Sequence, residues 1–593
     1  MTSRPRRRRI GHALLVVVGA TAILASVGCT SAGNDDPAVV TLPENNTTTL
    51  PPATRAPGGQ AAPEGPTEPP EVQWVTQIGG AGDDSFNSVT GAGADVVATG
   101  VTSQGVNEPT AGGTDVLTAR VDSEGKIDKL SQFGSAADDN ALAVTSLNSQ
   151  SRAGQNGTGP GGVPGTSTIP SGGAIPPGGT GPDGTAPDGT APNGTAPDDG
   201  TVGTDTLPIA CGTTLGSLGS SQHGAIDAWC GPAETGDRSS GVLGEVPGIA
   251  NGITQMGGEG NDSITGLAQA GSSSRSNQRP ADFFYMSGAT DGFYPGAEDP
   301  AGQGLGGGDA LAFRSSMDGS ASWIRQFGTQ SADSALGVCA VGSEGFYVGW
   351  TEGDLSGQSK GGRDAWISLI DASGIQRWIT QFGSAGDDEF RAVANAGEAA
   401  RGTMQLIAVG SSTGDVDAEG PTMNSGRSDA IAASFAPDGS VLWSRQFGSG
   451  LDDSATGVVV DGSTIYVTGT TSSAAAGADG VVGQSGTGDS TTTTTEPPVK
   501  GLGDLDTTIG EGGAKDVFLA ALNAETGEIL WIVRLGSDKD DVATGITATG
   551  NGLLVISGTT NGQLGDNVPA GGNDGFLLAF PLPAAGGAAA SSV

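Results

Sequence analysis

Apolar and polar residues alternate over short segments of the chain, and Gly- and Asp-containing turns separate the segments. The pattern is clearest between residues 389 and 448, where it reads EFRAVANAG, MQLIAVGSS, SDAIAASFAPDG and VLWSRQFG in turn. Alternation with a period of two residues predicts β-strands, and the unit has no sustained helical period. The pattern therefore predicts a unit of four short strands.

This unit is repeated along most of the chain. Its last strand carries the clearest signature, WITQFG at residues 378–383, and similar signatures precede and follow it. The Gln of the signature, with Arg in the last copy, gives seven positions: Gln77, Gln132, Gln255, Gln326, Gln381, Gln446 and Arg534. Radially repeated four-stranded units of about 55 residues are typical of β-propeller blades. We therefore predict an all-β, seven-bladed propeller of four-stranded antiparallel blades over residues 73–582.

A Trp opens the signature in five of the seven copies. These residues are Trp74, Trp323, Trp378, Trp443 and Trp531, whereas the copies that read on from Leu130 and Ile253 lack the Trp. One blade cannot bury both of its faces, so adjacent blades must stack. We expect the large apolar Trp side chain to form part of the contact between blades.

The first and last predicted strands each lack a partner within their own repeat. The ordered region begins with a fourth strand at residues 74–78 and ends with a third strand at residues 574–580. Pairing the two would remove two exposed sheet edges. The sequence therefore predicts that the N-terminal strand closes the seventh blade, antiparallel to the C-terminal strand.

The recurring motifs resemble a known family. W-x-x-Q-F-G, an Asp, Y-V-T-G-T-T and G-G-x-D-A-F follow one another in order from Trp74 to Phe580. This order is similar to that of the seven-bladed β-propeller repeat of many bacterial extracellular proteins. The resemblance implies the fold and an exported location, and it implies no agreed activity. LNAETGEILWIVRLG, at residues 522–536, is also similar to the tryptophan-docking motif of quinoprotein propellers.

Two Asp residues recur in every copy. One lies seven residues after each signature position: Asp84, Asp139, Asp262, Asp333, Asp388, Asp453 and Asp541. The other precedes each third strand: Asp115, Asp227, Asp309, Asp364, Asp429, Asp516 and Asp574. Because these residues occur in all seven blades, we interpret them as structural. Their carboxylates are expected to accept hydrogen bonds from turn N–H groups. The loops after the fourth and second strands emerge on one face of a propeller, so all fourteen should lie near that face.

A structural calcium ion is the alternative for these aspartates, and no other cofactor is expected. GGAGDDSFN, at residues 79–87, and GGEGNDSIT, at residues 257–265, match a calcium-binding nonapeptide. That motif binds calcium when its copies follow one another directly, and here they stand a blade apart.

Aromatic residues in the loops of the same face are candidates for ligand binding. Phe293 and Tyr294 lie in DGFYPGAED, at residues 291–299, and Trp350 is placed just after the second strand of the fourth blade. Exposed aromatic side chains in acidic loops suit a sugar or a peptide. Local packing of the loop on the sheet is the alternative.

The N-terminus predicts export. Residues 1–28 combine a basic RPRRRR segment with an apolar stretch that ends ASVG before Cys29. This end resembles a bacterial lipoprotein signal, which implies a lipid (palmitate) anchor on Cys29 at the outer side of the cell membrane. Ser26 departs from the usual aliphatic residue, which leaves secretion without lipid and a retained membrane anchor as alternatives. Composition predicts disorder in a tether at 29–72, insertions at about 150–206 and 471–512, and a tail at 583–593.

The other cysteines suggest a disulfide. Cys211 and Cys230 lie on neighbouring predicted strands of an exported protein, so we expect a bridge between them. Cys339, in a run of small apolar residues, reads as an inert thiol.

The remaining composition limits the function classes. The net charge of −39 disfavours nucleic acid as a partner. The two histidines, His12 and His223, are too few for a His-pair zinc site and disfavour a Ser-His-Asp triad. We therefore expect a binding or interaction module of the cell envelope without catalytic activity. The alternatives are a carboxylate-based hydrolase of a glycan or wall polymer and a scaffold for envelope assembly.

Overall fold

The computed structural model describes residues 65–66, 68–148, 206–218, 224–234, 253–269, 283–297, 306–316, 321–397, 404–416, 427–472 and 513–582. The predicted signal peptide with Cys29, the tail, and most of the predicted tether and insertions lie outside these residues. The chain divides into a unit of Met1–Gln60, wholly outside them, and a unit of Ala61–Val593. Among the described residues, no helix has the length and apolar character needed to cross a membrane.

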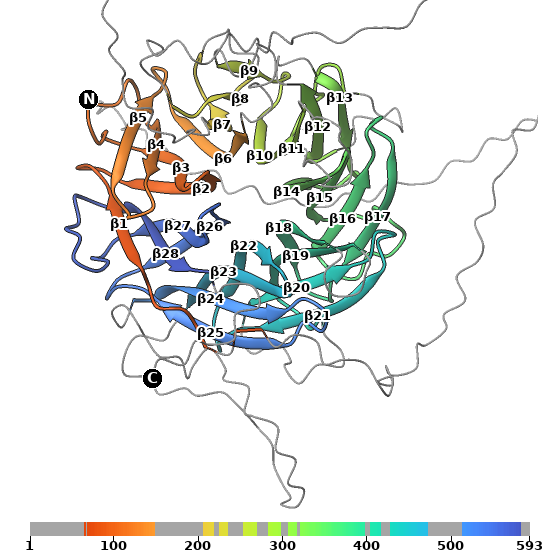
Figure 1. The fold of residues 1–593 in the computed structure, drawn as a ribbon. Coiled ribbons are helices and arrows are strands. Elements are labelled where there is room, and N and C mark those ends of the chain that lie inside the picture. Colours follow the sequence, from red (N-terminus) through yellow and green to blue (C-terminus); the bar gives the residue numbers. More distant parts are fainter. Residues whose placement is uncertain are drawn as a thin grey trace, which may run out of the picture. The chain divides into compact units, whose positions relative to one another are not determined.

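The described residues form seven four-stranded antiparallel sheets arranged as a ring (Figure 1). We number the blades from the N-terminus and name the strands of each A to D from the inside outwards. Blades 1 to 3 contain β2 (Asp84–Ala92), β3 (Asp95–Thr102), β4 (Asp115–Val121), β5 (Ile127–Phe133); β6 (Asp139–Asn148), β7 (Thr206–Thr214), β8 (Asp227–Pro232), β9 (Thr254–Met256); and β10 (Asp262–Gln269), β11 (Phe283–Thr290), β12 (Asp309–Ser316), β13 (Ala321–Phe327).

The remaining blades follow the same order. Blades 4 to 6 contain β14 (Asp333–Val341), β15 (Glu344–Thr351), β16 (Asp364–Ile370), β17 (Gln376–Phe382); β18 (Asp388–Gly397), β19 (Gln405–Ser412), β20 (Asp429–Phe435), β21 (Val441–Phe447); and β22 (Asp453–Asp461), β23 (Thr464–Ser472), β24 (Lys515–Asn523), β25 (Ile529–Leu535). Blade 7 contains β26 (Asp541–Ala548), β27 (Leu553–Thr560), β28 (Asp574–Pro581) and, as its strand D, β1 (Trp74–Ile78).

The closure of the ring is confirmed. The first strand, β1, pairs antiparallel with β28, and Trp74 stands opposite Ala579 while Gln77 stands opposite Phe576. In Figure 1 the two ends of the chain of blades meet at this sheet. The ring is therefore held shut by a backbone ladder between residues about 500 positions apart in sequence.

The core lies between the blades. We call the boundary between two adjacent blades a seam and number it by its blades, as in seam 2/3. The described residues form seven buried clusters, and each combines side chains of two adjacent blades. Strands B and C are buried on both faces, as β16 and β20 are along their whole length. Burying these apolar surfaces is what holds the blades together.

The inner strands are linked in a second way. Every strand A begins with an Asp, and the third residue after this Asp is a β-bulge. In β2 the bulged residue is Asn87, between Phe86 and Ser88. The bulged residue donates a side-chain hydrogen bond to a backbone carbonyl of the next blade at four seams: Asn87 to Ala141, Thr265 to Ala335, Thr456 to Ala543 and Thr544 to Phe86. These bonds fix the spacing of the strands around the inner wall of the ring.

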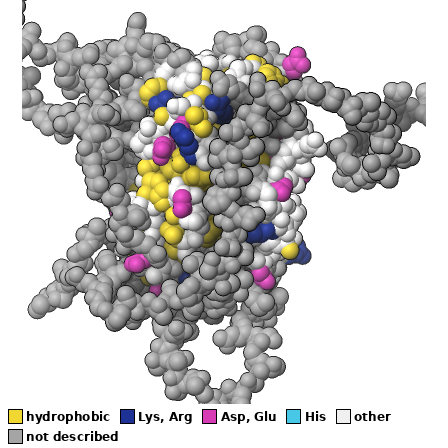
Figure 2. All heavy atoms as spheres, turned by 90° about the vertical axis from the view of Figure 1, so that its right-hand side faces the viewer, with side chains coloured by type: hydrophobic (Ala, Val, Ile, Leu, Met, Phe, Trp, Pro, Cys, Tyr) yellow, Lys and Arg dark blue, Asp and Glu magenta, His cyan; other side chains and the backbone are white. Residues whose placement is uncertain are grey.

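The outer strands show the composition expected of exposed sheet edges. Figure 2 views the rim from the side that carries β17, where hydrophobic side chains are interspersed with acidic and basic ones. On β17 itself Arg377 is 56 % exposed and pairs with Asp371, and the neighbouring Ile375 is 50 % exposed. Charged residues on an edge disfavour pairing with other chains.

The predicted disulfide is present. Cys211 lies within β7 and stands directly opposite Cys230 on β8. The Cα atoms are 4.1 Å apart. The bridge joins strands B and C of blade 2.

Candidate functional site

The fourteen repeated aspartates are buried, at 0–3 % exposure. The Asp that opens each strand A accepts a hydrogen bond from the backbone N–H four residues earlier, at 2.5–2.7 Å in all seven blades. It thereby fixes the turn between strand D of one blade and strand A of the next. This is the structural role of Asp in turns.

The Asp that opens each strand C is bonded to the signature Gln of its own blade. The Nε2–H of the Gln donates to this carboxylate at 2.6–3.2 Å in six blades. In blade 6, Arg534 takes the place of the Gln, and its Nε lies 3.3 Å from Asp516. The repeated Gln and Asp thus connect strands C and D at the same end of each blade.

The same Gln also holds the loop between strands B and C. In blade 4, Gln381 donates to the carbonyl of Gly353 at 2.9 Å and accepts from the N–H of Leu355 at 3.0 Å. Six blades have the second bond and five have the first. Sequence reasoning used this Gln only as a marker of the repeat. Its recurrence was the signal that it has a structural role.

The two aspartates of adjacent blades converge on one glycine. At seam 4/5, a Cβ on Gly383 would lie 2.5 Å from Asp388 and 2.8 Å from Asp364. Burial raises the pKa of Asp388, and the nearby Asp364 carboxylate adds to the effect. Burial likewise raises the pKa of Asp453 to about 6 and that of Asp516 to about 6. Closely spaced buried carboxylates favour the protonated form.

No group of three or more His, Cys, Asp or Glu side chains within the described ranges is arranged to hold a metal ion. Each seam brings together two of these carboxylates. The Asp of strand A accepts a hydrogen bond from a turn N–H, and the Asp of strand C accepts one from the Gln amide in most blades. Structural calcium stays a prediction, which thermal melts with calcium and with a chelator would check. These pairs recur at every seam, so they do not distinguish one part of the ring from another.

The Trp side chains of strand D do distinguish the seams. At four seams the indole Nε1–H donates to a backbone carbonyl in the turn between strands C and D of the next blade: Trp74 to Ser123, Trp323 to Ala372, Trp378 to Pro437 and Trp443 to Ala524, at 2.9–3.2 Å. A glycine of the same turn lies against the ring, and a Cβ on Gly374 would come 2.8 Å from Trp323. We call the space that this indole fills the tryptophan slot of the seam.

Two of the other three seams fill the slot in a different way. At seam 1/2, Lys129 stands at the Trp position, and its ammonium group lies 3.3 Å from Glu234 of blade 2, which Arg120 also contacts at 2.6 Å. At seam 6/7, Trp531 packs in the core, but its Nε1 has no hydrogen-bond partner among the described residues. Blade 7 takes its strand D from the N-terminus, so no turn connects its strands C and D.

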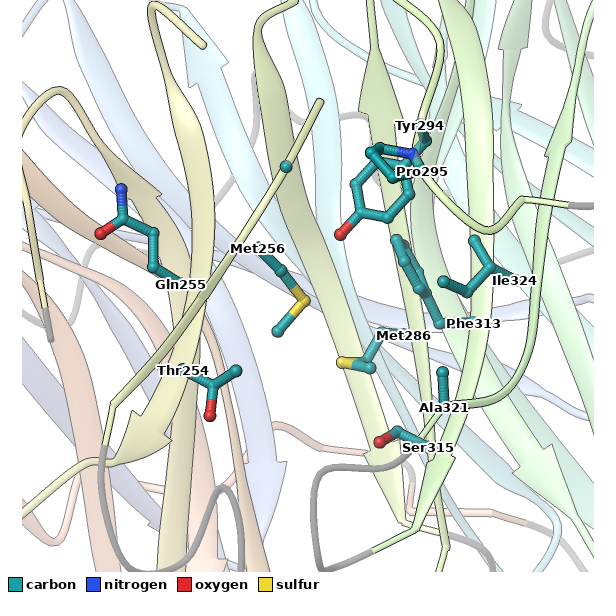
Figure 3. Close-up of a pocket in the computed structure, with 11 residues that line it drawn as sticks. Thr254, Gln255, Met256, Met286, Tyr294, Pro295, Phe313, Ser315, Ala321 and Ile324 are labelled. Carbon is teal, nitrogen blue, oxygen red and sulfur yellow. The ribbon is translucent and has the colours of Figure 1, made fainter. Parts of the chain in front are cut away.

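Among the described residues, no side chain fills the slot of seam 2/3. The repeat places Gly252 at the Trp position, outside the described residues, and strand D of this blade, β9, has three residues where β5, β13, β17, β21 and β25 have seven. A pocket of about 290 Å³ lies here (Figure 3). It is lined by residues of β9, β11, β12 and β13, together with Gly257, Tyr294 and Pro295.

The pocket corresponds in position to the filled slot of the next seam. Met286 lies four residues before the end of β11, as Tyr347 lies four residues before the end of β15. Ser315 lies six residues after the start of β12, as Ile370 does in β16. Tyr347 and Ile370 pack in one cluster with Trp323. Their counterparts in blade 3 line the pocket, so the pocket occupies the place that Trp323 fills at seam 3/4.

The lining of the pocket is mainly apolar. In Figure 3 the side chains of Met256, Met286, Tyr294 and Phe313 point toward one another, while Gln255 turns away. Gln255 is bonded instead to Asp227 at 2.7 Å and to Gly216 at 3.0 Å. None of the eleven lining residues is charged. The disulfide lies behind the pocket, with the Cys230 sulfur 3.7 Å from the Met286 sulfur.

The three aromatic candidates of the sequence lie in different environments. Phe293 is 61 % exposed, as expected. Tyr294 is buried, as the alternative of local loop packing predicts, because its backbone N–H donates to Gln326 at 2.9 Å and its ring packs edge-on against Phe313. Burial raises the pKa of its hydroxyl, which therefore stays neutral.

Trp350 lies within β15, rather than after it, and is half-buried. The guanidinium group of Arg363 stacks over its ring at 4.0 Å, and Arg363 also approaches Glu389 of blade 5 at 3.7 Å. The structure therefore places Trp350 and Tyr294 in separate blades and does not bring the candidates together. Arg363 already covers the indole ring of Trp350, so the pocket of seam 2/3 is the stronger candidate site.

Comparisons with known proteins show similarity in solved structures alone. No family model matches the chain, and no curated protein matches it. Phage phi92 endosialidase is similar over 88 % of this chain and 71 % of its own, at 8 % identity and a TM-score of 0.36. The quinohemoprotein alcohol dehydrogenase from Comamonas testosteroni is similar over 86 % and 77 %, at 9 % identity and a TM-score of 0.32. The N10 neuraminidase-like protein of A/little yellow-shouldered bat/Guatemala/060/2010 is similar over 63 % and 91 %, at 8 % identity and a TM-score of 0.29. These values carry no argument about activity.

Proposed function

We propose that this protein is a binding propeller of the bacterial cell envelope, anchored by lipid on Cys29, and that it binds its ligand in the pocket of seam 2/3. The observation that carries the proposal is the one seam at which the repeat supplies no side chain for the slot. A pocket of about 290 Å³ is near the lower end of the usual range for ligand sites. The described lining residues carry no charge, which suits an apolar group.

The repeated aspartates favour binding over hydrolysis. Hydrolysis by paired carboxylates needs both groups within reach of the substrate. The fourteen repeated aspartates are at most 3 % exposed, and hydrogen bonds fix them in turns and between strands. We therefore propose that they hold the blades and leave recognition to the asymmetric seam.

Binding to envelope material tests the proposal. The full chain would be immobilised, and retention of a detergent-solubilised envelope fraction would be measured for the unchanged chain, Met256→Lys and Phe293→Ser. Met256 is partly exposed and lines the pocket, so a lysine there should cost about tenfold in retention because its charge enters an apolar site. Phe293→Ser removes an exposed aromatic outside the pocket and should leave retention unchanged. The opposite pattern would move the site to the loops, and release of glycan fragments would favour the hydrolase.

The anchor has a separate test. The intact chain should partition into the detergent phase, and Cys29→Ala should remain in the aqueous phase or fail to mature. A mature chain that begins at another residue without lipid would contradict the anchor and would leave the pocket unaffected.

A further inference from the structure

We infer that the pocket of seam 2/3 takes a neutral aromatic ring of the size of an indole, either from a tryptophan side chain of a polypeptide or from a small aromatic molecule. The inference rests on the proposed function and names the ligand chemistry of the same site. The chain itself shows which group fits such a space. Four other seams fill the corresponding slot with an indole ring, held by a carbonyl of the adjacent turn.

The lining residues favour an aromatic ring over an aliphatic group. The thioether sulfurs of Met256 and Met286 make favourable contacts with ring edges. Tyr294 and Phe313 already pack edge to face, with centroids 5.2 Å apart, and offer a further aromatic surface. Because none of the described lining residues is charged, the pocket favours a neutral ring such as indole over a charged group.

Methionine methyl spectra of the full chain would detect the ligand directly. The chain has six Met residues, two of which line the pocket, and Met404 in blade 5 is an internal control. With methyl-labelled methionine, N-acetyl-tryptophanamide should shift the Met256 and Met286 signals upfield through its ring current and leave Met404 unchanged. The expected dissociation constant is about 0.1–1 mM, as is ordinary for a fragment of this size. N-acetyl-leucinamide should bind at least about tenfold more weakly.

Gly252→Trp supplies the missing ring within the chain. Its Met256 and Met286 signals should already be shifted upfield without ligand, and N-acetyl-tryptophanamide should change them no further. Unaltered Met signals with the amide in the unchanged chain, or equal binding of the amide in Gly252→Trp, would overturn the inference. Tighter binding of the amide than of free indole would identify a tryptophan side chain as the source of the ring, and tighter binding of free indole would identify a small aromatic molecule.

The result separates this inference from the proposed function. If Met256→Lys loses envelope material but the amide shifts neither methyl signal, the pocket binds another chemistry and only the indole inference fails. If the amide shifts both signals but Met256→Lys retains envelope material, the pocket is not the site that holds the envelope ligand.

Discussion

At the scale of single residues, the signature W-x-x-Q-x-G is a set of three contacts with different partners. The Trp reaches the next blade, the Gln holds its own blade and loop, and the Gly leaves room for two carboxylates. The sequence predicted that these residues recur and that the Trp packs between blades. It could not show that the Gly is required by aspartates 5 residues and 19 residues away in the chain, because that proximity exists only after folding.

Gly383→Ala should therefore destabilise the protein by about 1–3 kcal/mol, the usual cost of overpacking. The new Cβ would lie 2.5 Å from Asp388 and 2.8 Å from Asp364, two buried side chains fixed by hydrogen bonds. Gly307→Ala is a matched control, because no atom would come closer than 3.3 Å to its Cβ. Denaturant unfolding of both variants checks this. Equal midpoints for the two would show that the carboxylates move aside at little cost.

At the scale of elements, the buried Asp pairs make the blade junctions sensitive to pH. The folded pKa of Asp453 is raised to about 6 from 3.8, and the pKa values of Asp84, Asp262, Asp333, Asp388 and Asp541 are also raised, each chiefly by burial. The folded state then binds more protons than the unfolded state between about pH 4 and pH 6, so stability falls as pH rises through this window.

The melting temperature should therefore be higher at pH 5 than at pH 7.5. One pKa unit corresponds to about 1.4 kcal/mol, and the net charge of −39 acts in the same direction. Asp453→Asn keeps an acceptor for the Ser449 N–H but cannot titrate, so its melting temperature should change less between the two pH values. Calorimetry at both values decides. A lower melting temperature at pH 5 would mean that other groups dominate the titration.

At the scale of the whole molecule, the repeat determined how much could be predicted. Seven signatures and two unpaired terminal strands predicted the number of blades and the closure, because both follow from counting strands. The pocket was not predicted, although its signal was present in the Gly at position 252. A missing side chain becomes a site only when residues of the next blade, such as Met286 and Phe313, surround the space it leaves. The burial of Tyr294 likewise depends on Gln326, 32 residues later.

The closure makes a prediction about truncated chains. Deleting residues 73–79 removes β1, its ladder to β28 and the contact of Trp74 with blade 1. Because each ladder hydrogen bond contributes about 0.5–1.5 kcal/mol, this deletion should lower the melting temperature sharply. Deleting residues 32–60, which precede the unit that contains the strands, should have little effect. Similar melting temperatures for the two truncated chains would contradict the closure.

The central claim is that seam 2/3 is a tryptophan slot left open by the repeat, and the number of indole-type sites tests it most directly. Equilibrium titration with N-acetyl-tryptophanamide should give one site for the unchanged chain and none for Gly252→Trp. Trp323→Gly opens the corresponding slot of seam 3/4, so it should give two sites and should be stabilised by the amide more than the unchanged chain is. One site in all three chains, or none in the unchanged chain, would contradict the account.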